Sequence, residues 1–246
     1  MSSSPRIAVA AVCLALAGCS SSREPARDGE VVSLEVSAHS TGAVATRGTA
    51  STPRVDPLRD PSRATLVAPP SFNVQFETSA GRFDMVCTRE WAPHGVDRIY
   101  NLVRIGYFKD IAFFRVIKSP RPFIVQFGLH GDPTVNAAWK DARLEADTVV
   151  GSNRRGVVSF AMAGAPTTRT VQLFINLGDN PSLDGMGFAP VCIVTGQGMD
   201  VVDKLYGDYA EAPSQARIQD EGNVFLRQAF PNLDYIVQAT MALPAN

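Results

Sequence analysis

Hydrophobic and polar residues alternate over short stretches between residues 72 and 240, which is the pattern of β-strands with one buried face. The stretch FNVQFETSAGRFDMVC, residues 72–87, predicts two strands around a turn at Ser79–Gly81. Further strands are predicted at residues 113–117, 123–127, 156–162, 171–176, 190–195 and 235–239. The pattern therefore predicts a mostly β domain.

Helical spacing interrupts these strands in only a few places. Apolar residues recur at helical spacing in residues 93–103, and shorter helices are predicted at residues 199–205 and 221–229. The stretch through Trp139 and Asp147 is predicted to be a long loop. Many short strands with few helices favour a closed β-barrel whose ends are capped by helices.

The N-terminus has a different pattern. Arg6 precedes a short apolar stretch, Ile7–Ala17, which is shorter than the ~20 residues that a membrane span requires. Small residues follow it, so residues 1–18 are predicted to be a secretory signal peptide. The ending Leu16–Cys19, Leu-Ala-Gly-Cys, resembles the bacterial lipobox, which implies cleavage before Cys19 and lipidation of its thiol. The alternative is an ordinary signal peptide with an incidental cysteine.

A lipid anchor at Cys19 would hold the protein stably on a membrane surface if it carried two or more acyl chains. No aspartate follows Cys19, and by resemblance to lipoprotein sorting rules this favours the outer membrane. We therefore expect a protein of the bacterial cell envelope, anchored on the periplasmic side of the outer membrane with its folded domain outside the cytosol.

Residues 19–70 are rich in Ser, Thr, Ala, Arg and Pro and contain few aromatic residues. Such a composition cannot bury a core, so this stretch is predicted to be a flexible linker behind the lipidated cysteine. Residues 31–36, VVSLEV, are an exception with the pattern of a short strand. Residues 71–246 are then predicted to be the folded domain.

Composition and motifs exclude several classes of function. The 246-residue chain carries a formal net charge of −1, so its overall charge does not predict a nucleic-acid partner. His39, His94 and His130 are scattered and lack the spacing of metal ligands. No G-x-S-x-G, Walker A or H-E-x-x-H motif occurs in the sequence. We expect neither a metal nor a cofactor, and we expect a monomer.

Three polar side chains interrupt apolar strands: Arg115, Gln126 and Gln172. Burying such a group is costly unless it is paired or faces a site, so these residues indicate a site. Two other interpretations stay open from the pattern alone. Arg115 could pair across the barrel with Asp84 or another carboxylate, or the three polar residues could line the cavity of a small-ligand barrel of lipocalin type.

Five segments resemble, in order and spacing, the motifs of cyclophilin-type peptidyl-prolyl cis-trans isomerases. They are FFRVI, PFIVQFG, SFAMAG, VQLFINLG and LDGMGFAPV, which begin at Phe113, Pro122, Ser159, Val171 and Leu183. Each is weak alone, but five in the right order are specific, and the match extends from about Phe72 to Thr240. The resemblance implies a closed eight-stranded antiparallel β-barrel capped by two or three helices, and an enzyme that isomerises X-Pro bonds.

The resemblance also implies roles for individual residues. Arg115 would be the catalytic residue, because its planar donor fork can stabilise a twisted X-Pro bond. The substrate-binding residues would be Phe123, Ile124, Phe174 and Leu183 as an apolar slot for proline, Gln126 and Gln172 as orienting groups, and Ala161 and Met162 as an extended edge for backbone contacts. The expected partners are proline-containing segments of extracytoplasmic polypeptides, whose folding the enzyme would assist.

Several positions depart from the family pattern. Phe114 stands where the family usually has histidine, Met162 where it has asparagine, and Ser182 where many members have tryptophan. Lys118–Pro122 replaces a shorter turn, and the Gly-Phe pair at 187–188 supplies the residue that takes the place of a second histidine. We expect activity with an altered peptide preference, and weak binding of cyclosporin-like ligands because the tryptophan is missing.

The altered rim of the predicted site also supports a second hypothesis. In it the cyclophilin scaffold is a non-catalytic module, or a chaperone, that binds proline-containing segments while the linker lets it search. Catalytic turnover would then be absent, and Arg115 would contribute to binding alone.

Cys87 and Cys192 would both lie outside the cytosol, where disulfides persist. Bridging them would close a loop of roughly 100 residues. Both also lie on predicted strands, where they could equally be buried free thiols, and the sequence leaves the two alternatives open.

Overall fold

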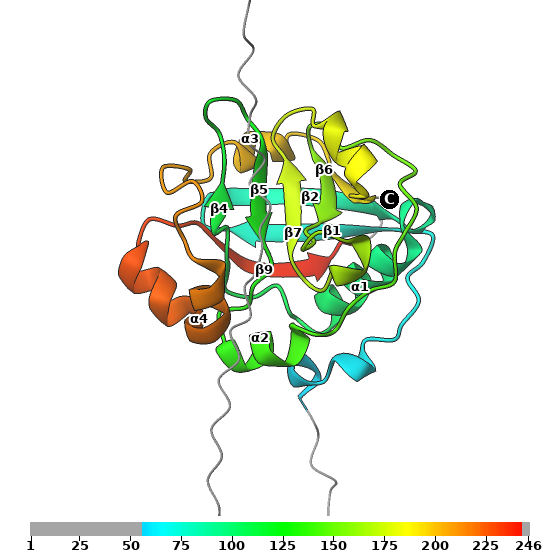
Figure 1. The fold of residues 1–246 in the computed structure, drawn as a ribbon, viewed down its shortest axis with the longest axis horizontal. Helices are drawn as coiled ribbons and strands as arrows, with labels where there is room; N and C mark the ends of the chain where they lie inside the picture. The colour runs from blue at the N-terminus through cyan, green and yellow to red at the C-terminus, as the bar shows by residue number, and fades with distance from the viewer. Residues whose placement is uncertain (1–55, 243–246) are drawn as a thin grey trace, which may run out of the picture. The chain divides into compact units, whose positions relative to one another are not determined.

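Nine strands form a single antiparallel sheet in the computed structural model, which describes residues 56–242 (Figure 1). They are β1 (Ser71–Thr78), β2 (Gly81–Thr88), β3 (Ile111–Ala112), β4 (Arg115–Val116), β5 (Ile124–Phe127), β6 (Val157–Phe160), β7 (Leu173–Asn176), β8 (Pro190–Val194) and β9 (Tyr235–Met241). Hydrogen bonds join them in the order β3-β9-β1-β2-β8-β6-β7-β5-β4. The mostly β prediction is confirmed, but the closed eight-stranded barrel is wrong in detail, because the sheet has nine strands and its order has two ends.

The two end strands of this sheet are neighbours in the sequence. β3 and β4 are separated only by Phe113 and Phe114, both of which are buried. Phe113 N–H donates to the carbonyl of Asp234, next to β9, whereas Arg115 pairs with Gln126 of β5. The stretch predicted as one strand at 113–117 is therefore divided between the two ends of the sheet, and the sheet curls into a half-barrel.

Four α-helices pack around the sheet within residues 56–242, where two or three were expected. They are α1 (Pro93–Arg104), α2 (Pro133–Trp139), α3 (Gly198–Val202) and α4 (Gln215–Ala229). α2 lies in the stretch predicted to be a loop; Asp132 caps it by accepting from Thr134 N–H, and Pro133 begins it. None of the helices in this part of the chain is long and apolar enough to cross a membrane.

α4 begins at Gln215, earlier than the predicted start at residue 221, and lies at the β4 end of the sheet (Figure 1). Gly222 interrupts it with a φ of 59°. A Cβ at this position would lie 2.1 Å from the carbonyl oxygen of Gly131, so only glycine fits. Because the apolar pattern is broken at this glycine, the sequence indicated only the second part of the helix.

The main hydrophobic core is filled by side chains from many strands of the sheet. Its largest fully buried members are aromatic: Trp139, Tyr107, Phe76, Phe108, Phe113, Phe127 and Phe160. Several of these rings contact one another edge to face, as Phe76 does with Phe108 and Phe127. Gln126 alternates along β5 with the core residues Val125 and Phe127 and so faces away from this interior, which is filled by apolar side chains. The structure therefore contradicts a small-ligand barrel whose cavity the polar residues would line.

A disulfide joins the middle of the sheet. Cys87 of β2 and Cys192 of β8 are directly paired in register, with Cα atoms 4.0 Å apart, and are bonded through their sulfurs. Both residues are fully buried. Of the two alternatives left open by the sequence, the structure therefore has the disulfide, and it closes a loop between residues 105 positions apart.

Residues 57–70, which we call the strap, lie against α1 and α2 ahead of the first strand. The strap begins with two 3-10 helices, η1 (Pro57–Arg59) and η2 (Pro61–Arg63). Leu66 exchanges two hydrogen bonds with the side chain of Asn101, and Trp139 Nε1 donates to the carbonyl of Leu58 at 2.8 Å. The folded domain therefore begins before the predicted boundary at residue 71, whereas Cys19 and residues 1–55 lie outside the described residues.

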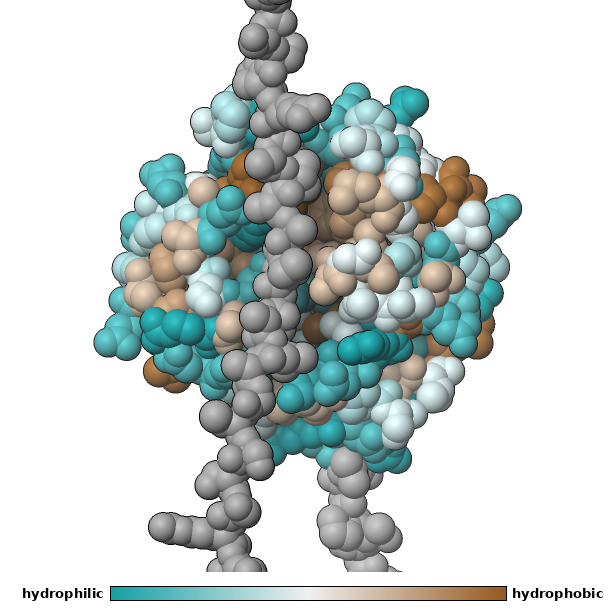
Figure 2. All heavy atoms as spheres, viewed as in Figure 1, coloured by the Kyte–Doolittle hydropathy of each residue, from teal (hydrophilic) through white to brown (hydrophobic). Residues whose placement is uncertain are grey.

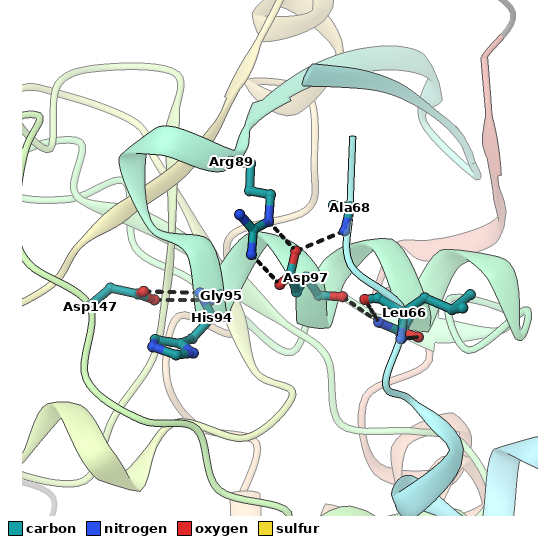
Figure 3. Close-up of polar contacts among 8 residues, drawn as sticks. Leu66, Ala68, Arg89, His94, Gly95, Asp97 and Asp147 are labelled. Carbon is teal, nitrogen blue, oxygen red and sulfur yellow. Dashed lines mark hydrogen bonds and ion pairs between the residues drawn. The ribbon is translucent and has the colours of Figure 1, made fainter. Parts of the chain in front are cut away.

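Two carboxylates organise the start of α1 (Figure 3). Asp97 accepts from Ala68 N–H of the strap and from two nitrogens of Arg89. Asp147 accepts from the backbone N–H groups of His94 and Gly95 at 3.0 and 2.9 Å, as a helix-capping carboxylate does. The loop that carries Asp147 is thereby fixed to α1.

Candidate active site

Arg115 lies on β4, the last strand of the sheet, directly opposite Gln126 on β5. The next pair across the sheet is Gln126 with Phe174 of β7, and the one after that is Phe174 with Ser159 of β6. Residues opposite each other in a sheet point to the same face. The four side chains therefore form one row across four strands, with the cation at its edge.

The sequence of β5 shows why this row faces away from the main core. Val125 and Phe127 belong to the main core, whereas Ile124 and Gln126 alternate with them and point to the opposite face. Both faces of the strand are buried, so its sequence is almost continuously apolar. Gln126 stands out in that run because it is a polar residue only 5% exposed.

A chain of side-chain hydrogen bonds starts at Arg115. Its Nη1 donates to Gln126 Oε1 at 3.2 Å, and Gln126 Nε2 donates to Gln172 Oε1 at 2.8 Å. The structure therefore brings together the three polar residues that the sequence selected. Gln126 is held at both ends of its amide, so it orients the guanidinium on one side.

Glu211 holds the other side of the guanidinium. Its Oε2 accepts from Arg115 Nε at 3.1 Å and from Nη2 at 2.9 Å. The Arg115 side chain is 23% exposed and that of Glu211 is 65% exposed. Arg115 thus pairs with a carboxylate, but not with Asp84, which accepts from Gln75 instead.

An apolar cluster, which we call the slot, lies beside the polar chain. Ile124, Phe174 and Leu183 are buried in it, and Phe123, Ala161 and Phe188 pack around them half-exposed. Every apolar residue predicted for the proline slot is in this cluster. Figure 2 shows hydrophobic residues gathered over this part of the face, beside β6 and β7, within a mostly hydrophilic surface.

Phe188 completes the slot, and of the pair Gly187–Phe188 it is the residue that faces the slot. The Phe188 ring contacts Phe174 edge to face, with centroids 5.5 Å apart. Gly187 instead ends the 3-10 helix η5 (Pro181–Met186) with a φ of 92°. An aromatic ring therefore stands in the slot where the family pattern has histidine.

A buried amide network supports the slot from beneath. Asn180 Nδ2 donates to the carbonyl of Phe123, and Asn153 Nδ2 donates to that of Phe188. Asn176 joins the two asparagines, and Asp184 accepts from Asn153 and from Ser152 Oγ, at 2.6 Å in the latter case. Burial alone would raise the pKa of Asp184. The hydrogen bonds from Ser152 and Asn153 outweigh burial, so the pKa of this carboxyl lies below its usual value.

The predicted peptide edge at Ala161 and Met162 is only partly as expected. Ala161 N–H donates to the carbonyl of Gln172 at 2.9 Å, so this donor is committed to the protein. Met162 lies half-exposed after the end of β6, where the loop towards the 3-10 helix η4 (Pro166–Thr168) begins. Ala161 contributes a wall of the slot, and Met162 stays a predicted contact residue.

The other departures from the family pattern fall in two different places. Ser182 is exposed on η5, and Lys118–Pro122 forms a largely exposed loop leading to the slot residue Phe123. Phe114 is only 1% exposed and packs in a separate cluster that includes Phe225 and Leu226 of α4. The phenylalanine that stands in place of the family's histidine therefore packs against α4 and does not lie at the rim of the site.

Sequence reasoning missed Glu211, the role of Phe188 and the asparagine network. Glu211 lies in a loop without periodicity, and no local pattern distinguishes it from other exposed acids. Asn176, by contrast, could have been found, because it is a polar residue in an apolar strand like Gln126 and Gln172.

In the part of the chain that the structure describes, surface hollows of about 390 and 470 Å³ lie elsewhere. One lies between the end of α1 and β9, lined by residues such as Arg104 and Thr240, and the other lies beside Arg89 and Pro93. Neither includes a residue of the Arg115 chain or the slot. Among residues 56–242, no group of three or more His, Cys, Asp and Glu side chains is placed to hold a metal ion.

Comparison with known proteins yields consistent matches. A family model described as "Cyclophilin type peptidyl-prolyl cis-trans isomerase/CLD" matches residues 73–222. The chain is 32% identical over 162 residues to peptidyl-prolyl cis-trans isomerase A of Dickeya dadantii, covering 61% of this chain and 83% of the relative. It is 32% identical over 142 residues to peptidyl-prolyl cis-trans isomerase B of Escherichia coli, covering 54% and 84%.

The fold is also similar to a solved structure. A cyclophilin type peptidyl-prolyl cis-trans isomerase of Cryptosporidium parvum matches with a TM-score of 0.51 and 20% sequence identity, covering 71% of this chain and 99% of that chain. At this identity the likeness concerns the fold alone, and it agrees with the curled nine-stranded sheet described above.

Proposed function

The chain belongs to the cyclophilin-type peptidyl-prolyl cis-trans isomerase family, and we propose that it isomerises X-Pro bonds of polypeptides outside the cytosol. One observation carries this proposal: a guanidinium at the edge of an apolar slot, on the same face of the sheet. The half-exposed members of the slot, Phe123, Ala161 and Phe188, offer a proline ring an apolar surface, and the guanidinium is suited to the polar bond beside it.

The chemistry of the reaction requires little more than these groups. An X-Pro bond rotates over a barrier of about 20 kcal/mol because its C–N bond has partial double-bond character. A catalyst must hold the ring and stabilise the twisted bond, in which this resonance is lost. A donor to the prolyl nitrogen, or to the preceding carbonyl, disfavours the planar form.

Arg115 has donors left for this task. Its guanidinium has five N–H groups, and its contacts within residues 56–242 use Nε, one N–H of Nη1 and one of Nη2. One N–H on each terminal nitrogen is then free to meet a substrate. Gln126 and Gln172 hold the guanidinium in place, while Phe123, Phe174 and the rest of the slot hold the proline.

A protease-coupled isomerisation assay on the purified protein tests the proposal, with a tetrapeptide that contains an Ala-Pro bond. We expect the wild-type chain to accelerate isomerisation and Arg115→Ala to lose most of the acceleration. Arg82→Ala, which changes an exposed arginine on β2, is the matched control and should behave as wild type. If the wild-type protein leaves the uncatalysed rate unchanged, the chain is not an isomerase.

A second candidate is a non-catalytic module or chaperone that binds proline-containing segments. The pairing of Arg115 with Glu211 favours it, because the carboxylate occupies two donors of the guanidinium. Titration of a fluorescent proline-rich peptide separates the two functions. Binding that weakens in Arg115→Ala, together with the absence of turnover in either protein, supports the module.

We also propose that the protein is a monomer, tethered by a lipid at Cys19 through the linker to the periplasmic side of the outer membrane. Three observations support this location: the Leu-Ala-Gly-Cys sequence, the absence of aspartate after Cys19, and the Cys87–Cys192 disulfide, which is typical of oxidising compartments. Light scattering of the purified protein tests the monomer.

Mass spectrometry of the N-terminal peptide, combined with membrane fractionation, tests the anchor. We expect an acylated N-terminal Cys19 and recovery of the protein in the outer-membrane fraction. The variant Cys19→Ser should leave that fraction. An unmodified Cys19, or an intact N-terminus that retains residues 1–18, would contradict the proposal.

A further inference from the structure

We propose that residues 207–229, the loop before α4 and α4 itself, form a brace that positions Arg115, and that Glu211 is its positioning residue. This inference rests on the proposed isomerase function. The brace engages three consecutive residues: Phe114, which precedes β4, and Arg115 and Val116 of β4 itself.

The first contact is made by a side chain. Glu211 accepts hydrogen bonds from Nε and Nη2, which form one edge of the Arg115 guanidinium, and Gln126 accepts one from Nη1. A planar group that is held along two of its edges cannot rotate about its long axis. The two free N–H groups therefore point in a fixed direction, which Gln126 alone would not impose.

The second contact is made by the backbone. β4 is the last strand of the sheet, so one of its edges is not covered by another strand. Val116 N–H donates to the carbonyl of Ala210 at 3.1 Å, which fixes the loop to that edge. Ala210 has a φ of 46°, an uncommon value for a non-glycine residue, and this conformation immediately precedes Glu211.

The third contact is apolar. Phe114 is 1% exposed and belongs to the cluster that contains Ile218, Phe225 and Leu226 of α4. The phenylalanine in place of the family's histidine is therefore accounted for by α4. The helix stabilises the backbone on one side of Arg115, and the loop stabilises it on the other.

The geometry favours positioning over blocking. Glu211 contacts Arg115 through one carboxylate oxygen, and its side chain is 65% exposed. The guanidinium is also 23% exposed while it is paired. A substrate can thus approach Arg115 without displacing the carboxylate.

Exchange of the Arg115 Nε proton with water tests the contact by NMR, without a substrate. We expect a resolved, slowly exchanging Nε–H signal in the full chain, and its loss or faster exchange in Glu211→Ala. Glu77→Ala is the matched control, because it removes an exposed carboxylate on β1 that accepts from Gln238 and lies outside the brace. An Arg115 signal that is unchanged in Glu211→Ala would overturn the proposal.

Kinetics by NMR exchange spectroscopy on a peptide with an Ala-Pro bond test the consequence. In Glu211→Ala we expect kcat to fall about 10-fold or more while KM stays within about twofold, because misplacement of a catalytic group slows the chemical step. Glu211→Gln keeps an acceptor and should retain most of the rate, and the control Glu77→Ala should match wild type.

The outcomes separate this inference from the proposed function. A wild-type protein without activity refutes the function, and the NMR signal still reports whether Glu211 holds Arg115. An active wild type with an equally active or faster Glu211→Ala refutes positioning, and a faster variant would show that Glu211 competes with the substrate.

Discussion

Of the arginine–carboxylate pairs in residues 56–242, the pair of Arg169 with Asp147 and the pair of Arg115 with Glu211 have sharply different surroundings. Arg169 and Asp147 are each 1% exposed, and Arg169 Nη1 donates to Asp147 at 3.0 Å. Arg115 and Glu211 are 23% and 65% exposed, at a similar separation of 2.9 Å. The first pair thus lies inside the protein, and the second lies at the edge of its candidate active site.

The difference lies in what it costs to break each pair. Arg169 also donates to the carbonyls of Pro166 and Glu145, and Asp147 also accepts from the first backbone N–H groups of α1. Removing either side chain therefore leaves buried polar groups without their hydrogen-bond partners. The pair of Arg115 with Glu211 is open to water and contributes at most about 1 kcal/mol to stability. A substrate cannot reach the interior pair, whose role is structural. The exposed pair leaves part of its arginine accessible to a substrate.

The largest expected effect concerns the disulfide in the interior region. Replacing both Cys87 and Cys192 by Ser should lower the free energy of unfolding by about 4–5 kcal/mol in the chain-entropy model. Urea unfolding of the variant, and of wild type with and without reductant, measures it. A loss below about 1 kcal/mol would show that the interior does not depend on this bond.

Arg169→Met removes the buried cation and keeps much of its volume. We expect a loss of about 3–5 kcal/mol in the free energy of unfolding, because the buried Asp147 loses its charged partner. The kcat/KM of the folded variant should stay within about twofold of wild type. Arg217→Met, which breaks an exposed pair on α4, is the control and should cost less than about 1 kcal/mol.

Phe123→Ala tests the site region instead. Phe123 is half-exposed in the slot, so the loss should appear as a decrease in kcat/KM of about 10-fold to 100-fold, equivalent to about 1.5–3 kcal/mol of apolar contact with the proline. Phe123→Leu should recover part of the activity. Destabilisation with normal kcat/KM would place Phe123 in the core and not in the site.

Acid should affect both regions, because each contains a carboxyl with a lowered pKa. Burial opposes the shift of Asp97, but the hydrogen bonds from Arg89 and Ala68 outweigh it, and Asp184 is lowered by Ser152 and Asn153. Both have folded pKa values below the ordinary 3.8, so their stabilisation is complete above that pH and is lost as the pH falls through the folded pKa.

Urea unfolding between pH 6 and pH 2 measures this loss, which we expect to begin below about pH 4. Asp184→Asn should cost about 1–2 kcal/mol at neutral pH, since it removes a charged acceptor, and should flatten the acid limb of the curve. If the stability of this variant falls with acid as steeply as that of wild type, Asp184 does not contribute to the acid loss of stability.

The sequence predicted the centre of the candidate site because polar residues that are costly to bury lie there. Arg115, Gln126 and Gln172 interrupt apolar strands, and the structure connects them by hydrogen bonds. The slot followed from the family motifs, and its residues cluster as predicted. The strands were also predicted well, because their alternation reflects burial on one face or on both.

The parts that were missed depend on contacts between distant segments. Glu211 reaches Arg115 across 96 positions, and nothing local to its loop indicates a partner. The strap was assigned to the linker because its composition is polar, yet backbone hydrogen bonds to Asn101 and Asp97 hold it. α2 was missed for a different reason, since it is a single short helix whose start is marked only by the local Asp132 cap.

The most direct test measures activity and stability on the same samples of Arg115→Ala and Arg169→Met. The account predicts opposite outcomes: Arg115→Ala should lose about 100-fold or more in kcat/KM, as expected when a transition-state donor is removed, with the free energy of unfolding within about 1 kcal/mol of wild type. Arg169→Met should lose stability and keep its kcat/KM. An Arg115→Ala protein that keeps most of its activity, or whose loss follows its unfolding, would contradict the central claim that Arg115 is the catalytic residue.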